Sequence, residues 1–224
     1  MAQATDQVTR RTTEMRLASI TKKVLMAVTG LGWFLYVVMH LLGNLVLWAG
    51  PEQYNAYSHW LISNPLIYPA EIGLLAFLLV HVASAWRVTN ENHAARPQPY
   101  VMKAASTGKS TFASRTMWYG GVILLLFIII HTWMFKFGDH EGHLGLWGLV
   151  VRSFKNPWIA LGYIIAMIPL GLHLSHGFAS ALQTLSVPHS RWHTGLRQAS
   201  RILGWGLAIG FMILPIWALL FAKV

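Results

Sequence analysis

Five long apolar segments constrain this chain more than any other feature. A helix needs about 20 predominantly apolar residues to cross the hydrocarbon core of a bilayer. The segments of that length are Val24–Trp48, Ile67–Trp86, Met117–Phe137, Trp158–Leu182 and Ile202–Ala222. Only 11% of the residues are charged, against about 25% in ordinary soluble domains. The sequence therefore predicts an all-α fold, an integral membrane bundle of five transmembrane helices.

The polar segments between these spans predict the domain organisation. Residues 1–22 are polar and mixed in charge, so we expect a cytoplasmic N-terminal segment and no cleavable signal peptide. Residues 23–224 form a single five-helix domain with a polar loop at about 88–116. That loop contains GKST, which resembles the end of a phosphate-binding P-loop, but the glycine that the motif requires upstream is absent. We therefore expect a solvated loop or a docking surface there.

The distribution of lysine and arginine predicts the orientation. With a cytoplasmic N-terminus, 13 of the 17 basic residues face the inside. The inside set is Arg10, Arg11, Arg16, Lys22, Lys23, Arg87, Arg96, Lys103, Lys109, Arg115, Arg191, Arg197 and Arg201; the outside set is Lys136, Arg152, Lys155 and Lys223. The positive-inside rule thus places the N-terminus in the cytoplasm and the C-terminus outside. The same rule explains the net charge of +10, so no nucleic-acid partner is expected.

Each of the first four spans holds one histidine well inside it, and the fifth holds none. At about 1.5 Å of rise per residue, His40 and His131 lie roughly 20 to 24 Å from the cytoplasmic ends of their helices. His81 and His173 lie only about 8 Å from the cytoplasmic face. The four histidines therefore form an outer and an inner pair. Ionisable residues inside membranes commonly have a function.

Two neutral imidazoles facing each other across a bundle are the ligands that a six-coordinate haem iron requires. The sequence therefore predicts two haems, with His40 and His131 on the outer one and His81 and His173 on the inner one. Zinc is the competing metal, but it usually takes three or four protein ligands at one level. A proton relay is another alternative, although such relays usually include membrane carboxylates. Arg87, six residues beyond His81, is the best candidate for an inner propionate contact.

Several quoted stretches carry a family resemblance. They are SITKKVLMAVTG leading into WFLYVVMHLLGNLVLWAG, then PEQYNAYSHWL, HVASAWR, HTW and HLSHGFASALQTL. Over essentially its whole length, the chain resembles the five-helix, di-haem cytochrome b subunit of succinate:quinone oxidoreductases (complex II) and fumarate reductases. In this family a glycine tends to follow the fourth ligand by four residues, as Gly177 follows His173. We therefore expect His173 to be the ligand, and His176 to be a neighbour or a propionate contact of the inner haem.

The resemblance implies a division of labour within a complex. A flavoprotein subunit and an iron–sulfur subunit would dock on the cytoplasmic side and oxidise succinate, a reaction of the tricarboxylic acid cycle. This chain has no cysteine, so it cannot hold a cysteine-ligated cluster, and it has no dinucleotide fingerprint or succinate-oxidising site. It would be the quinone-reacting membrane subunit, carrying electrons through two b haems to a quinone, with menaquinone as the expected type. The expected location is the inner (cytoplasmic) membrane of a prokaryote.

The quinone site is predicted less sharply than the haem ligands. Quinone reduction needs proton donors near the outer haem. Tyr54, Tyr57, Ser58, His59 and Glu71 lie in or beside the outer loop, but interfacial anchoring explains them equally well. His140 and His143 could bind a surface metal, although a solvated loop is the simpler interpretation. Two other functions stay open: a cytochrome b anchor of a hydrogenase or formate dehydrogenase, and a non-redox five-helix transporter.

Overall fold

The computed structural model describes residues 2–95, 111–140, 142, 144–187 and 190–223. Over these residues the chain contains helices and turns but no β-strand. Five of the helices in this part of the chain are long and apolar enough to cross a membrane: Ser19–Ala49, Ile67–Ala94, Phe112–Lys136, Pro157–Thr184 and His193–Leu220. The predicted all-α fold with five membrane-spanning segments is confirmed. The cytoplasmic position of the N-terminus stays a prediction.

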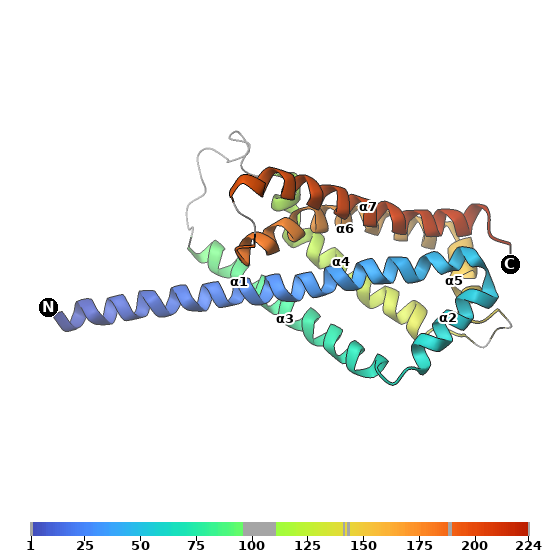
Figure 1. The fold of residues 1–224 in the computed structure, drawn as a ribbon, viewed down its shortest axis with the longest axis horizontal. Helices are drawn as coiled ribbons and strands as arrows, with labels where there is room; N and C mark the ends of the chain where they lie inside the picture. Colours follow the sequence, from blue (N-terminus) through green and yellow to red (C-terminus); the bar gives the residue numbers. More distant parts are fainter. Residues whose placement is uncertain (1, 96–110, 141, 143, 188–189, 224) are drawn as a thin grey trace.

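The helices run lengthwise through an elongated bundle (Figure 1). The long helices are α1 (Ala2–Leu45), α3 (Ile67–Ala94), α4 (Phe112–Lys136), α6 (Pro157–Thr184) and α7 (His193–Leu220). The shorter elements are η1 (Val46–Ala49), α2 (Pro51–Ser63), α5 (Gly145–Lys155) and η3 (Ser190–Trp192). The two termini lie at opposite ends of the bundle, and α2 and α5 lie at the C-terminal end (Figure 1).

Several helix boundaries differ from the sequence prediction, including the start of α7 at His193 instead of Ile202. Helix α1 begins at Ala2, so residues 2–22 continue the first span and project beyond the other helices (Figure 1). Glycine and proline would weaken or end a helix, and neither occurs in that stretch. Helices α3 and α4 also extend into the predicted loop, to Ala94 and from Phe112. Most of GKST lies outside the described residues, but its Thr111 caps α4 by accepting a hydrogen bond from the Ser114 amide at 3.1 Å.

Helices α2 and α5 lie between the predicted spans, in segments for which the sequence predicts no element. Asn55 of α2 joins them, because its Nδ2 donates to the Leu144 carbonyl and its Oδ1 accepts from the Trp147 amide, both at 2.9 Å. The Trp147 indole donates to the Leu47 carbonyl at 3.0 Å. The main buried cluster gathers around these contacts: Leu47, Tyr54, Trp147, Val150, Val151, Phe154, Leu214, Ala218 and Ala222. The end of the bundle that holds the C-terminus is therefore the best-packed part of the described chain.

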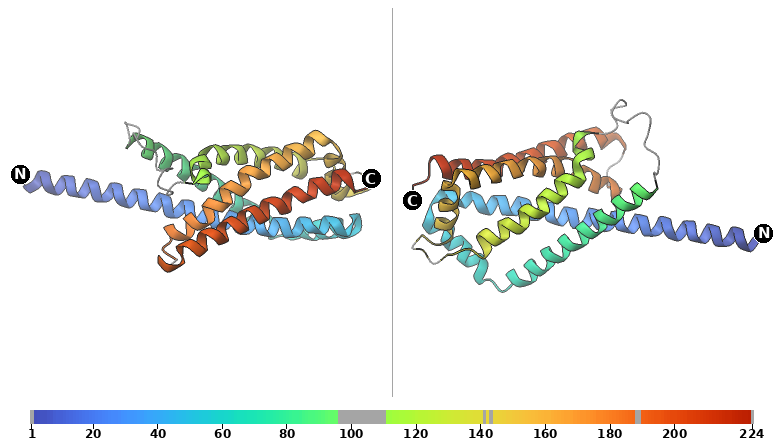
Figure 2. Two further views of the ribbon diagram at one scale, coloured as in Figure 1. Left: turned by 90° about the horizontal axis from the view of Figure 1, so that it is seen from above. Right: turned by 180° about the vertical axis from the view of Figure 1, so that it is seen from behind.

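Helices α6 and α7 run side by side and are held together by small residues (Figure 2). Ser200 of α7 is fully buried, and its hydroxyl donates to the Ser175 carbonyl at 2.8 Å. At Gly204, an added Cβ would lie 2.5 Å from the Ser175 amide nitrogen, and at Gly171 it would lie 2.8 Å from the Trp205 ring. Small side chains let membrane helices approach closely. The fifth span, which carries no central histidine, therefore braces α6.

The remaining helices pack in a definite order. Among the described residues, α3 packs on α1, α1 packs on α6, and α6 packs on α4. Helices α1 and α6 are therefore central, and α3 and α4 flank them. The flanking helices are poorly buried, since α4 has no buried residue in the described chain and α3 has one, Ser84.

The α6–α7 contact generates the first prediction. In Gly204→Ala, the new methyl group would meet backbone atoms that cannot rotate away, and overpacking of this kind costs about 1–3 kcal/mol. We expect a lower unfolding temperature for the purified protein in detergent. The matched control is Gly206→Ala on the same helix, where an added Cβ meets nothing within 4 Å. Equal unfolding temperatures for the two variants would contradict the close approach.

Candidate functional site: two histidine pairs across the bundle

The inner pair consists of His81 on α3 and His173 on α6. Their ring centroids are 6.3 Å apart, with an angle of 62° between the planes. The Nδ1 of His81 lies 3.1 Å from the Met26 carbonyl and 3.4 Å from the Thr29 hydroxyl, both on α1. A carbonyl only accepts hydrogen bonds, so His81 donates from Nδ1 and keeps a lone pair on Nε2. The histidine is thereby fixed in the tautomer that can bind a metal through Nε2.

Glycine makes room for the His81 ring beside α1. A Cβ added at Gly30 would lie 3.0 Å from Cε1 of His81. On the other side of the pair, a Cβ added at Gly121 of α4 would lie 3.7 Å from Cε1 of His173. Gly30 and Gly121 therefore mark the level of the inner pair on α1 and α4.

The outer pair consists of His40 on α1 and His131 on α4. Their ring centroids are 5.7 Å apart, and the planes are at 89°. The Nδ1 of His131 lies 3.3 Å from the Tyr163 hydroxyl of α6. Near His40, the Asn44 side-chain amide donates to the His40 carbonyl at 2.8 Å and lies 3.4 Å from Nε2 of the ring. Aromatic rings stack on both histidines: Tyr36 on His40 and Phe127 on His131.

The two pairs lie at separate levels along the bundle. On α1, His40 follows Gly30 by ten residues, and on α4, His131 follows Gly121 by ten residues. Each offset corresponds to about 15 Å along a helix. The spacing along α1 and the spacing along α4 thus give the same distance between the two levels.

The geometry of each pair suits a metal ion bound between the two rings. An imidazole nitrogen lies about 2 Å from a first-row metal ion, so two imidazoles on opposite sides of one ion have ring centres roughly 6 Å apart. The observed values are 5.7 Å and 6.3 Å. Within the described residues, no three or more His, Cys, Asp or Glu side chains converge. This donor set fits a group that brings its remaining ligands with it, as a haem does, better than it fits zinc.

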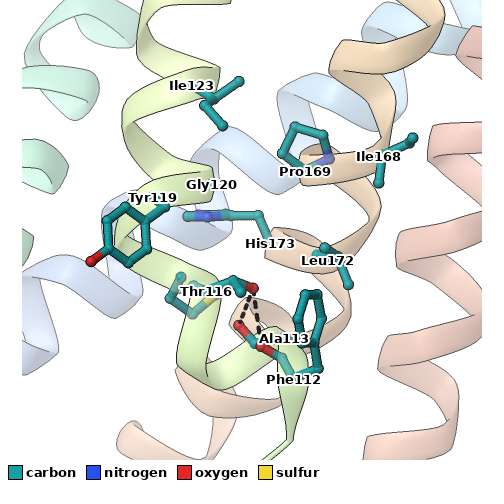
Figure 3. Close-up of a pocket in the computed structure, with 11 residues that line it drawn as sticks. Phe112, Ala113, Thr116, Tyr119, Gly120, Ile123, Ile168, Pro169, Leu172 and His173 are labelled. Atoms are coloured by element: carbon teal, nitrogen blue, oxygen red, sulfur yellow. Dashed lines mark hydrogen bonds between the residues drawn. The ribbon is translucent and has the colours of Figure 1, made fainter.

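A cavity of about 240 Å³ adjoins His173 between α4 and α6 (Figure 3). His173 extends from α6 towards Gly120 of α4, and Ile123, Ile168 and Leu172 are among the mainly apolar lining residues. The Nδ1 of His173 is buried and has no hydrogen-bond partner among the described residues. An unsatisfied buried nitrogen is costly in a membrane interior. The surroundings of His173 therefore have both the free volume and the vacant donor or acceptor that an apolar ligand with a polar centre would use.

The other residues predicted around the inner pair lie towards the same end of the bundle. His176 is half-buried, one turn beyond His173 on α6, and the two rings interact electrostatically. The ring that faces His81 is that of His173. Arg87 is exposed on α3, six residues beyond His81.

The predicted quinone-site residues fall into two groups. In the first group, Tyr54 is buried and donates to Oδ1 of Asn44 at 3.3 Å. The Tyr57 hydroxyl packs against α1, since a Cβ added at Gly43 would lie 2.5 Å from it. Glu71 of α3 forms an ion pair with Lys136 of α4. Gly43 lies three residues beyond His40 on α1, and Lys136 lies five residues beyond His131 on α4.

The second group lines a separate cavity that contains none of the paired histidines. Ser58 and His59 line this cavity of about 320 Å³, which lies between α2 and the start of α5. His140 also lines this cavity, and its Nε2 donates to the Phe135 carbonyl at 2.8 Å. His143 lies outside the described residues. The structure therefore brings Tyr57 and Glu71 close to the outer pair, and it does not bring Ser58 and His59 there.

Several residues that contact the histidines are not predicted from the sequence, among them Thr29, Asn44, Tyr36 and Tyr163. Asn44 and Tyr36 each lie four residues from His40 on one helix, so their contacts could have been predicted from helical periodicity. Thr29 and Tyr163 act from other helices. Their contacts depend on the register between helices, which no local pattern reveals.

One curated protein supports the resemblance predicted from the sequence. The chain is similar to the succinate dehydrogenase cytochrome b558 subunit of Bacillus subtilis (strain 168), with 22% identity over 159 residues, covering 68% of this chain and 73% of the relative. The resemblance to succinate dehydrogenase cytochrome b subunits is thereby confirmed. No protein-family model matches the chain, and no solved structure matches it.

The buried Tyr54 phenol, which lies outside the membrane-spanning helices, gives a pH-dependent prediction. Burial, with a smaller contribution from Tyr57, raises the pKa of Tyr54 to about 12. The neutral phenol therefore stabilises the folded state below pH 10, and this contribution is lost as the pH rises towards 12. We expect the difference in tyrosinate absorbance between the native protein and Tyr54→Phe to titrate near pH 12. A midpoint near 10, with the helical circular dichroism intact, would contradict the burial of this hydroxyl.

Proposed function

We propose that this chain is the membrane-anchor cytochrome b subunit of a succinate:quinone oxidoreductase. It would bind two b haems, His40 and His131 holding the outer one and His81 and His173 the inner one. The observation that carries the proposal is the pairing of four histidines, one from each of four helices, at two levels with ring separations of 5.7 Å and 6.3 Å. The similarity to a succinate dehydrogenase cytochrome b subunit supports the same function.

The packing of the helices also supports this proposal. The inner pair joins α3 to α6, and the outer pair joins α1 to α4. In the described chain, neither combination is among the helix pairs that pack extensively on one another. Haems bound between these helices would cover the poorly buried faces of α3 and α4. Bound haem would supply one-electron transfer at two levels of the membrane.

The chain's own residues orient the ligands and keep water from them. The Met26 carbonyl fixes His81, and the Tyr163 hydroxyl meets His131, so each of these rings keeps a defined tautomer. Apolar residues such as Ile123 and Leu172 line the cavity beside His173. Such a shell lowers the local polarity and tunes the potential of a bound redox group.

Electrons would enter at the end of the bundle that holds the N-terminus, where the iron–sulfur and flavoprotein subunits would dock on the cytoplasmic side. The Lys22–Glu91 ion pair joins α1 and α3 near that end. At the other end, Tyr57 and Glu71 would hold and protonate a quinone, with menaquinone as the proposed type. These side chains are a hydroxyl and a carboxylate close to the outer pair, which is the chemistry that quinone reduction needs. The chain would lie in the inner membrane of a prokaryote.

Single histidine variants test the assignment of the pairs. We expect His131→Ala to lose the outer haem and retain the inner one, and His81→Ala to do the converse, because each haem would lose one of two axial ligands. The measurement is the reduced-minus-oxidised absorbance spectrum of the purified complex. His176→Ala is the control and should retain both haems. Loss of both haems, or of neither, in folded single variants would contradict the two-level arrangement.

Gly177 tests whether a haem occupies the face of α6 that carries His173. A Cβ added at Gly177 meets nothing within 4 Å in the protein itself. If this space holds the inner haem, Gly177→Leu should lower the inner haem content without preventing folding. Gly206→Leu is the control, because Gly206 is equally open but lies on α7. An unchanged haem content in Gly177→Leu would mean that this face of α6 contacts lipid instead.

A further inference from the structure

Tyr163 of α6 contacts His131 across the bundle. Its hydroxyl lies 3.3 Å from Nδ1 of His131 and donates to the Met134 sulfur at 3.6 Å. The phenol ring packs among Phe127, Phe135 and Phe154, with centroid distances of 5.0 to 5.8 Å. Aromatic rings on three sides therefore hold the Tyr163 hydroxyl against one ring nitrogen of His131.

The proposed function sets the direction of both hydrogen bonds. Met134 and His131 lie three residues apart on α4, on the same side of the helix. With Nε2 of His131 bound to iron, Nδ1 carries the proton and donates it to the phenol oxygen. The phenol proton then points to the Met134 sulfur, which can only accept.

The inner pair is held differently. His81 donates from Nδ1 to the backbone carbonyl of Met26 at 3.1 Å. The main chain supplies that acceptor, so no side-chain substitution removes it directly. At the outer pair a single side chain supplies the acceptor. The chain can therefore adjust the environment of His131 independently of that of His81.

We infer that Tyr163 is a positioning residue that fixes the tautomer of His131 and thereby lowers the reduction potential of the outer haem. This inference rests on the proposed function. A hydrogen bond accepted from Nδ1–H makes the imidazole a more basic ligand. A more basic ligand stabilises the oxidised iron, which lowers its potential, and hydrogen bonding to axial ligands is one of the protein's means of setting that potential. Removing the phenol hydroxyl should therefore raise the potential of one haem.

The test is a redox titration of the haem absorbance in the intact membrane complex carrying Tyr163→Phe. We expect two haems per chain, as in the wild type, with a positive shift of one midpoint potential and no shift of the other. The low-spin electron paramagnetic resonance signal of the same haem should also move, because His131 loses its fixed orientation. Tyr68→Phe is the control: it removes the hydroxyl of an exposed tyrosine on α3, and both midpoints should stay in place.

An isosteric replacement keeps the test decisive if Tyr163→Phe loses the outer haem. A fluorinated tyrosine at position 163 retains the shape and the hydroxyl but is a weaker acceptor, so a smaller positive shift of the same midpoint is expected. Two unchanged midpoints with both haems bound, or a negative shift, would overturn the role of Tyr163 and leave the proposed function intact. A wild-type complex without haem would instead overturn the proposed function.

Discussion

The rest of this structure depends on how the chain accommodates four imidazoles inside apolar helices. A membrane interior offers no water, so each buried ring nitrogen needs a partner from the protein or from a ligand. The protein supplies one partner to His81 through the Met26 carbonyl and one to His131 through Tyr163. It supplies none to Nδ1 of His173 within the described residues. The rings of each pair lie close together, and a metal centre shared between them would satisfy the remaining nitrogens.

This requirement explains why packing is uneven across the bundle. Helices α6 and α7 meet closely through Ser200, Gly204 and Gly171, and the end of the bundle that holds the C-terminus is closed by α2, α5 and η1. By contrast, α3 and α4 bury little of their surface in the described chain. The well-packed part is a scaffold for α6, while the loosely packed helices carry the opposing histidines. A cofactor between them would complete the core of the bundle.

Hydropathy and helical rise were sufficient to predict the five spans and the two histidine levels, because both depend on local sequence. The short helices α2 and α5 could not be predicted in the same way, since Asn55 holds them together through contacts between residues far apart in the chain. The sequence alone also could not distinguish the quinone-site candidates that lie near the histidine pairs from those that do not. Tyr57 and Ser58 are adjacent, yet they face α1 and a peripheral cavity respectively. Tyr163 was missed because its contact depends on how α4 and α6 are aligned.

The central claim is that the two histidine pairs hold two haems, and a pyridine haemochrome assay of the purified membrane protein tests it most directly. With haem counted per chain, the arrangement at two levels predicts two b-type haems. A folded preparation that contains no haem, although haem was in excess during its production, would contradict the electron-transfer function. It would favour a non-redox membrane protein, such as a transporter.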